Sequence, residues 1–298
     1  MDIHRNRASW RAALSGVFTS VHTIAKGKDP RWYYNNLGEN VFTEQSKFLN
    51  LGYWADPETR TMDAASTALV DLVAGAAKLS AGDEVLDVGF GFGDQDIHWA
   101  KRYSPKRIVG INVTEKQVEE ARRRIAELGL DDRIDLRVGS ATDMRFAPES
   151  FDKVLAVESA FHFDTRDKFF GEAFRVLRPG GRITTADIIP LPGRRGSPLF
   201  TLQSQAPAEN HYPRDVYAER LRAAGFVNVE VRSIRKDVYD RYLEHLDRRS
   251  ASPDFKHKNP LLRLLLMKEN PLLTWLFASF DYVIASGEKP GNTPQPAA

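Results

Sequence analysis

The sequence of 298 residues contains no cysteine. This absence excludes disulfide bonds, thiolate metal sites, iron–sulfur clusters and cysteine nucleophiles. An excess of charge of one sign is missing too, because 42 Lys and Arg residues are balanced by 40 Asp and Glu residues. Such a balance provides no basic footprint for nucleic acid. We therefore expect neither cysteine chemistry nor a nucleic-acid partner.

The sequence also lacks an uninterrupted apolar run of membrane-spanning length. The nearest approach, residues 260–280, is broken by Arg263, Lys268 and Glu269, whereas a spanning helix needs about 20 predominantly apolar residues. The N-terminus has no signal-peptide core. We therefore expect no stable membrane insertion and a cytoplasmic location.

From residue 84 onward, short apolar segments alternate with helical patterns. Strands are predicted at 84–88, 107–112, 133–138, 151–157, 182–188, 227–234 and 281–288. Helices are predicted at 63–78, 94–102, 114–128, 168–177 and 214–224, and a turn at 179–181. The alternation indicates a parallel sheet covered on both faces. Helix 114–128 begins with a predicted capping box of Thr114 and Gln117.

The segments around this alternation suggest a domain organisation. Residues 1–62 are predicted to form a helical, aromatic-rich lid segment, and residues 63–289 the α/β domain. Within that domain, 235–280 is predicted to be a helical insertion that covers the substrate. Residues 290–298, PGNTPQPAA, have the composition of a disordered tail.

One motif points to a bound ligand. Residues 84–93, EVLDVGFGFG, run from a strand through Gly89, Gly91 and Gly93 into a helix. Glycines let the backbone approach a ligand closely, and a helix N-terminus offers free N–H groups. The third glycine comes one position too early for the dinucleotide fingerprint, and Asp87 would repel a pyrophosphate. We therefore expect a zwitterionic or cationic ligand.

The motif and its surroundings resemble the class I S-adenosylmethionine-dependent methyltransferases, in particular the erythromycin-type macrolide-sugar O-methyltransferases. The resemblance rests on FLNLGYW at 48–54, GDEVLDVGFG at 82–91, GSATD at 139–143, ESAFH at 158–162 and DIIPL at 187–191. It implies a Rossmann-like α/β fold with a seven-stranded, mostly parallel sheet and an antiparallel last strand. It also implies S-adenosylmethionine as the cofactor.

The resemblance carries a set of cofactor-binding positions onto this sequence. They are Asp87, Gly89, Gly91, Gly93, Gln95, Asn112, Val113, Gln117, Ser140, Ala141 and Glu158. Two of them depart from the family pattern. Asn112 stands where an acidic residue usually meets the ribose hydroxyls, and an asparagine can still pair with a diol. Ser140 stands where an aspartate commonly meets the adenine amino group, and a serine has a shorter reach.

Methyl transfer to an alcohol requires alignment of the two partners and removal of a proton. The resemblance implies that His162 is the general base, and an imidazole pKa of about 6.5 suits that role. Glu158 ends the fourth predicted strand and is expected to meet the cofactor and orient His162, while Asp187 ends the fifth and is expected to assist the base or bind a substrate hydroxyl. Purely structural roles for these three residues are the alternative.

The acceptor is expected to contact Tyr53 and Trp54, which the family places over the cofactor, while His211 is a second candidate for substrate contact. The spacing of His162, Glu158, Asp187 and His211 lacks the ligand patterns of a metal site, so no metal is expected.

The most favoured function is therefore O-methylation of a small, lipophilic or glycosylated natural product. Two alternatives stay open. One is C-methylation of a prenyl diphosphate or a sterol-like alkene, for which Glu158 and Asp187 would form an acidic wall. The other is a cyclase or binding protein that retains the cofactor without transferring methyl. The acceptor is expected to be a small molecule, and the sequence leaves the choice between a monomer and a homo-oligomer open.

Overall fold

A computed structural model describes residues 43–192, 206–251 and 277–291. Several expectations fall outside these ranges. They are the structure of the first 42 residues of the lid segment, the loop at 193–205, most of the later half of the helical insertion at 252–276, and the tail from residue 292. Within the described ranges, no helix is long and apolar enough to cross a membrane.

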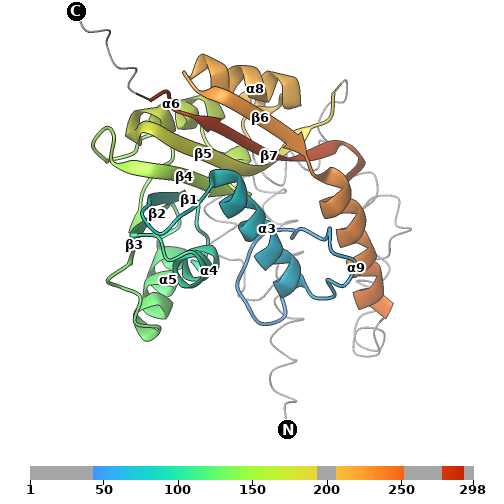
Figure 1. Ribbon diagram of the computed structural model, residues 1–298. Coiled ribbons are helices and arrows are strands. Elements are labelled where there is room, and N and C mark those ends of the chain that lie inside the picture. Colours follow the sequence, from blue (N-terminus) through green and yellow to red (C-terminus); the bar gives the residue numbers. More distant parts are fainter. Residues whose placement is uncertain (1–42, 193–205, 252–276, 292–298) are drawn as a thin grey trace, which may run out of the picture.

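The described residues form a seven-stranded sheet in the order β3-β2-β1-β4-β5-β7-β6 (Figure 1). The strands are β1 (Glu84–Val88), β2 (Arg107–Asn112), β3 (Ile134–Val138), β4 (Phe151–Val157), β5 (Leu177–Pro190), β6 (Val227–Ser233) and β7 (Phe280–Glu288). Strands β1 to β5 pair in parallel, and β7 runs antiparallel to β5 and β6. The predicted sheet with its antiparallel last strand is confirmed.

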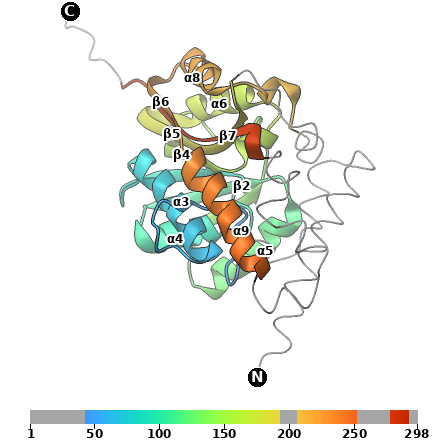
Figure 2. The same ribbon diagram turned by 90° about the vertical axis from the view of Figure 1, so that its right-hand side faces the viewer.

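Helices cover both faces of the sheet (Figures 1 and 2). They are α3 (Met62–Ala77), α4 (Asp94–Arg102), α5 (Glu115–Glu127), α6 (Arg166–Val176), α8 (Arg214–Ala223) and α9 (Arg241–Ala251), with the short helices η1 (Ala160–His162), η2 (Ala208–Asn210) and η3 (Lys236–Asp240). Leu69, Trp99 and Val118 anchor α3, α4 and α5 in one hydrophobic cluster. Phe169 and Tyr217 anchor α6 and α8 in a second cluster on the other face.

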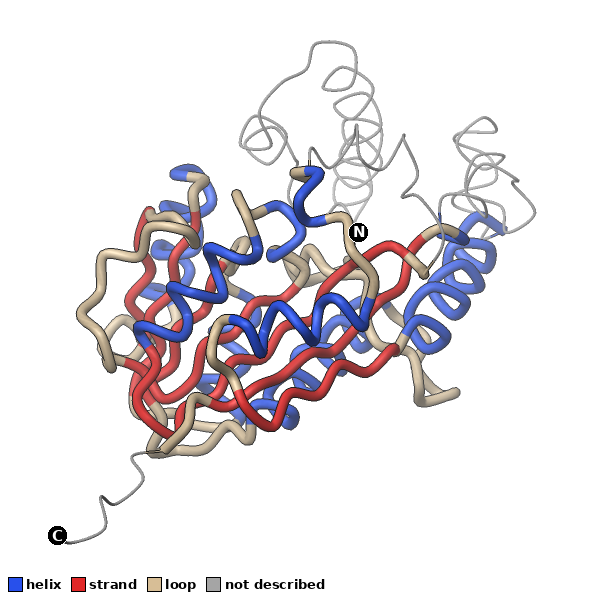
Figure 3. The backbone as a smooth tube through the Cα atoms, turned by 90° about the horizontal axis from the view of Figure 1, so that it is seen from above, coloured by secondary structure: helices blue, strands red, loops and turns tan. Residues whose placement is uncertain are grey.

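This arrangement places the carboxyl ends of β1 to β5 along one edge of the sheet. The view from above shows the strands running side by side between the helices (Figure 3). In a doubly wound sheet, loops at this edge form the ligand crevice. The fold therefore positions the glycine motif and the loops after β2, β3 and β4 next to one another.

Three local predictions need correction. Helix α6 begins at Arg166 rather than 168, because the Thr165 side chain caps it by accepting the Lys168 N–H at 3.5 Å. The turn predicted at 179–181 is an irregularity within β5, where the register against β4 shifts. The capping box of α5 is not formed. The N-cap Thr114 makes no side-chain cap bond, and the side-chain oxygen of Gln117 accepts from the Asn112 side chain instead.

One buried ion pair connects α6 to the end of β5. The Arg166 guanidinium lies 2.7 Å from the Asp187 carboxylate, and the two side chains are 1% and 0% exposed. Arg166 also donates to the Ile188 carbonyl at 2.7 Å and to the Asn210 carbonyl. The Tyr217 hydroxyl donates to the same Asp187 carboxylate at 3.1 Å. Every charged group in this interior pair therefore has several polar partners.

Removing one member of this pair should leave the other charge buried and uncompensated. We expect Arg166→Leu to lower the free energy of unfolding by about 3–5 kcal/mol, measured by urea denaturation. Arg220→Leu is a matched control, because Arg220 also lies 2.7 Å from an aspartate, Asp167, but both side chains are nearly half exposed. The control should lose less than about 1 kcal/mol. Equal losses in the two variants would contradict this account.

Candidate active site

The glycine loop turns sharply between β1 and α4. Gly89, Gly91 and Gly93 have φ angles of 88°, 59° and 82°, in the left-handed region that favours glycine. A Cβ on Gly89 would lie 2.5 Å from the Cβ of Ser159, so only glycine fits there. Gly93 is the N-cap of α4 and provides no side-chain cap. The loop therefore presents backbone rather than side chains at the crevice.

A cavity of about 610 Å³ opens in front of this loop. Most of the predicted cofactor residues line it, namely Gly89, Gly91, Gln95, Asn112, Val113, Gln117, Ser140, Ala141 and Glu158. Asp87 and Gly93 are not part of the lining. The structure thus brings together side chains from the ends of β1, β2, β3 and β4, as parallel strands ending at one edge must.

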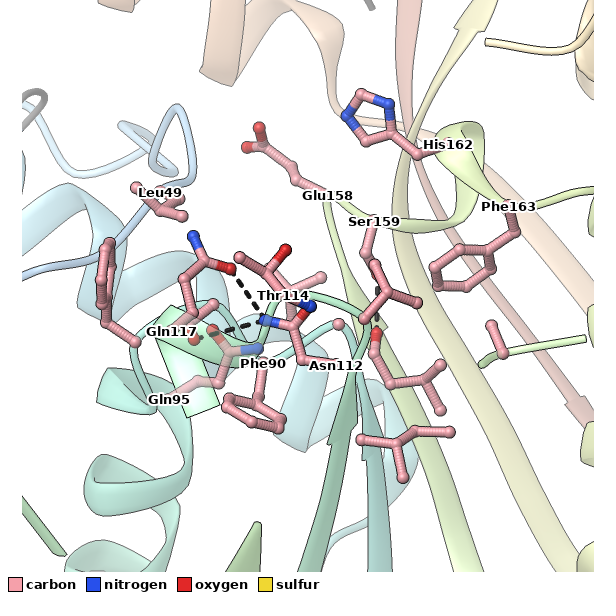
Figure 4. Close-up of a pocket in the computed structure, with 18 of the residues that line it drawn as sticks. Leu49, Phe90, Gln95, Asn112, Thr114, Gln117, Glu158, Ser159, His162 and Phe163 are labelled. Atoms are coloured by element: carbon pink, nitrogen blue, oxygen red, sulfur yellow. Dashed lines mark hydrogen bonds between the residues drawn. The ribbon is translucent and has the colours of Figure 1, made fainter. Parts of the chain in front are cut away.

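The amide side chains of Asn112 and Gln117 form a unit at the end of β2. Asn112 Nδ2 donates to Gln117 Oε1 at 2.8 Å, and Asn112 Oδ1 accepts the Thr114 N–H at 3.3 Å. These bonds fix the orientation of both amides (Figure 4). Gln117 is 3% exposed, and its Nε2 has no partner among the described residues. A buried donor of this kind requires an acceptor, which an oxygen of a ligand in the cavity would supply.

Two acidic side chains lie behind the glycine loop. Asp87 and Asp96 are both 0% exposed, and Gln95 Nε2 donates to Asp87 Oδ2 at 2.9 Å. Burial raises the pKa of Asp87 to about 7. Burial and the neighbouring Asp87 carboxylate raise the pKa of Asp96 well above its usual range. Two carboxyl groups buried side by side resist ionisation, and Asp87 supports Gln95 from behind instead of lining the cavity.

The opposite wall of the cavity comes from the segment after β4. Glu158, Ser159, His162 and Phe163 line it, and Figure 4 shows His162 across the cavity from Gln117. The Ser159 hydroxyl donates to the Val88 carbonyl at 2.7 Å and ties this wall to β1. The cavity thus has a glycine-loop side and a side that presents an imidazole.

The carboxylate of Glu158 is occupied by two donors. Its Oε1 accepts the Leu51 N–H and the Tyr282 hydroxyl, each at 2.6 Å. Glu158 is half-buried and lines the cavity, and desolvation of its carboxyl group raises its pKa to about 7. Glu158 therefore connects β4 with β7 and with the segment before α3.

That segment, residues 47–54, crosses the mouth of the glycine loop, and we call it the strap. The Lys47 N–H donates to Asp94 at 3.2 Å, and Lys47 Nζ lies 2.6 Å from Glu120. Lys47, Phe48, Leu49 and Asn50 line the cavity. The family motif at 48–54 predicts a segment that covers the cofactor. The predicted contacts are Tyr53 and Trp54, at the end of the strap, whereas the cavity is lined by its first four residues, 47–50.

Four other predicted site residues lie outside the cavity lining. Trp54 is 1% exposed and packs with Met62, while Tyr53 is half-buried. Asp187 is held by Arg166 in the ion pair described above. His211 is half-buried, and burial together with the Arg166 charge lowers its pKa. In its loop it is Pro207 that reaches the cavity.

Within the described part of the chain, no group of three or more His, Asp or Glu side chains is arranged to hold a metal ion.

Comparison with known proteins identifies the class to which this site belongs. A family profile described as a methyltransferase domain matches residues 86–185. Erythromycin 3''-O-methyltransferase of Saccharopolyspora erythraea is 40% identical over 265 residues, which cover 84% of this chain and 86% of the relative. The 27-O-demethylrifamycin SV methyltransferase of Amycolatopsis mediterranei is 34% identical over 231 residues, which cover 78% of this chain and 74% of that relative.

The fold agrees with this assignment. A crystal structure of geranyl diphosphate C-methyltransferase from Streptomyces coelicolor superposes with a TM-score of 0.69, covering 86% of this chain and 95% of that chain at 19% identity. The chain belongs to the class I S-adenosylmethionine-dependent methyltransferases. It is an S-adenosylmethionine-dependent methyltransferase, with natural-product O-methyltransferases among its relatives.

The cofactor of this family is S-adenosylmethionine, which supplies a methyl group already activated on a sulfonium. The residues present fit such a molecule. The backbone of Gly91 lines the cavity, and a Cβ placed there would lie only 3.3 Å from the Leu49 side chain. The unpartnered Gln117 Nε2 offers a donor to a hydroxyl of a ribose.

Gly91→Val should abolish binding of S-adenosylhomocysteine, measured by calorimetric titration. The new side chain would fill the approach to the loop and contact Leu49. Gly129→Val is the matched control, because Gly129 has a similar φ of 62° but has no atom within 4 Å of an added Cβ. Both variants therefore carry similar backbone strain. Loss of binding in both would assign the effect to strain instead of the cavity.

Glu158→Gln should make the protein less sensitive to pH. The folded protein keeps the Glu158 proton up to about pH 7, whereas an unfolded glutamate releases it near 4.5. Stability from this group is therefore present at low pH and decreases as the pH rises through this window.

As the pH rises from 4.5 to 8, the free energy of unfolding of the parent should therefore fall relative to that of Glu158→Gln, by about 3 kcal/mol at most. Urea denaturation at several pH values measures this difference. A constant difference across the range would show that Glu158 titrates normally.

Proposed function

We propose that this enzyme methylates a hydroxyl group of a small, lipophilic or glycosylated natural product, with His162 as the general base. The observation that supports this most directly is the position of His162, which lines the same cavity as the glycine loop but on the opposite wall. A base must lie within reach of the proton that it removes. An acceptor hydroxyl between the two walls would meet both the cofactor methyl group and the imidazole.

The state of the neighbouring carboxyl groups supports the same assignment. Glu158 already accepts from Leu51 and Tyr282, and Asp187 is paired with Arg166 away from the cavity. Their roles in this proposal are therefore to position the wall that carries His162. We further propose that residues 1–62 act as a lid segment and that residues 235–280 cover the acceptor, as the domain organisation predicted from the sequence suggests.

The charges of the cavity favour an uncharged or cationic acceptor over a diphosphate. The described lining contains no arginine, and its one lysine, Lys47, lies 2.6 Å from Glu120. Of its acidic residues, Asp94 is paired with Arg124 at 2.6 Å and Glu158 accepts from Leu51 and Tyr282, whereas Asp164 is exposed. Carboxylates repel a diphosphate and tolerate a neutral or basic molecule. This argues for O-methylation over C-methylation of a prenyl diphosphate, and the relatives named for O-methylation of natural products argue in the same direction.

The test is transfer of a labelled methyl group from S-adenosylmethionine to a panel of acceptors. The panel contains erythromycin lacking its 3''-O-methyl group, 27-O-demethylrifamycin SV, geranyl diphosphate and a sterol alkene. Product from either of the first two supports the proposal. Product from only the last two assigns the enzyme to C-methylation. Tight cofactor binding without transfer to any member would favour the non-methylating alternative.

His162→Ala should bind S-adenosylhomocysteine with nearly unchanged affinity and lose most O-methylation. Removal of a general base typically reduces the rate by about 10²–10⁴-fold. Calorimetry measures the first quantity and labelled transfer the second. His98→Ala is a suitable control, because His98 of α4 pairs with Asp71 of α3 and does not line the cavity. A variant that keeps full O-methylation without His162 would refute the assigned base.

A further inference from the structure

A single side chain holds both flanks of the residue that we assign as the base. Asn210 Nδ2 donates to the carbonyl oxygen of Phe161 at 3.2 Å and to that of Phe163 at 2.8 Å. These carbonyls precede and follow His162 in the chain. A primary amide has two N–H donors, and Asn210 uses both to bracket one residue.

The bracketing side chain is itself fixed in place. Asn210 is 2% exposed, and its Oδ1 accepts the backbone N–H of Arg166 at 2.8 Å. Its backbone carbonyl accepts from the Arg166 guanidinium, which is in turn anchored on Asp187. Because all of these groups are buried, a change in any one of them would leave polar atoms unpaired. The position of Asn210 therefore depends on the interior ion pair.

The bracket connects the two segments that form the acceptor side of the cavity. Asn210 ends η2 and belongs to the same loop as Pro207, which lines the cavity. Phe161 and Phe163 flank the base on the other segment. The glycine-loop side, with Asn112 and Gln117, is organised by separate hydrogen bonds. A defect in the bracket should therefore affect the acceptor side and leave cofactor binding intact.

We infer that Asn210 is a positioning residue for methyl transfer, which holds the His162 loop at the geometry that proton removal requires. This inference rests on the proposed function, because it assigns Asn210 a role through His162. A displacement of about 1 Å can reduce an enzymatic rate by about 10²-fold, so a loop of this kind gains from being held at both ends.

The first test needs no acceptor. Histidine labelled with ¹⁵N is introduced, and the His162 ring signals are assigned by their absence in His162→Ala. In Asn210→Ala these signals should shift or broaden, and the pH midpoint of the ring should change. Asn210→Ser keeps one hydroxyl donor and should show a smaller change. It also replaces the first variant if Asn210→Ala does not fold.

Tyr103→Phe is the control for loss of a tyrosine hydrogen bond elsewhere in the fold. The Tyr103 hydroxyl donates to Asp71 of α3 at 2.9 Å, outside the network of Arg166, Asp187 and Asn210. The His162 signals should stay unchanged in this variant, and all three variants should bind S-adenosylhomocysteine with parental affinity. Unchanged His162 signals in both Asn210 variants would overturn the inference.

The second test uses labelled methyl transfer to whichever of the two demethylated acceptors, the erythromycin or the rifamycin, accepts a methyl group. Asn210→Ala should lower kcat by about 10–100-fold with little change in the KM for S-adenosylmethionine. In a His162→Ala background the same substitution should change the residual rate by less than about twofold, because the two residues act as one unit.

Equal losses in both backgrounds would show that Asn210 acts independently of His162 and would refute the inference. If His162→Ala retains full activity, the proposed base is wrong, and the NMR experiment still decides whether Asn210 positions this loop. The two failures are therefore distinguishable.

Discussion

The wall of the cavity that carries His162 depends on a guanidinium that is buried beside one carboxylate. Arg166 and Asp187 are almost completely removed from water, so each must be surrounded by hydrogen-bond partners to be tolerated. The guanidinium obtains them from Ile188 and Asn210, which lie on different segments of the chain. Because few arrangements satisfy so many buried groups at once, the pair fixes α6, the end of β5 and η2 relative to one another.

The two walls of the cavity are organised by separate sets of contacts. The glycine-loop wall combines backbone, with three glycines in the left-handed region, and the hydrogen-bonded amides of Asn112 and Gln117. The wall that carries His162 is held by a network of buried polar side chains around Arg166. The strap touches both walls, since Lys47 bonds to Asp94 and Leu51 to Glu158. The two walls therefore depend on different contacts, and one segment connects them.

The sequence predicts the parts of this site that are encoded locally. The predicted bounds of β1, α4, β2 and β4 agree with those of the structure. Each of these elements is encoded by apolar residues and glycines at neighbouring positions in the sequence. The pairs that decide the roles of acidic residues are distant in sequence. Tyr282 bonds to Glu158 across 124 positions, and Arg166 to Asn210 across 44. Neither pairing leaves a periodic signal, so the sequence predicts neither the bond of Arg166 to Asp187 nor the two bonds of Asn210 on either side of His162.

The bonding of Glu158 separates closure of the strap from the charge of the site. Both donors bind the same oxygen, Oε1, so a proton on Oε2 leaves the bonds to Leu51 and Tyr282 in place. The strap can therefore stay closed whether Glu158 is ionised or neutral. The negative charge, in contrast, changes near pH 7, and it lies on the wall that carries His162 (Figure 4). Protonation of Glu158 therefore changes the charge of this wall without breaking the bonds that hold the strap.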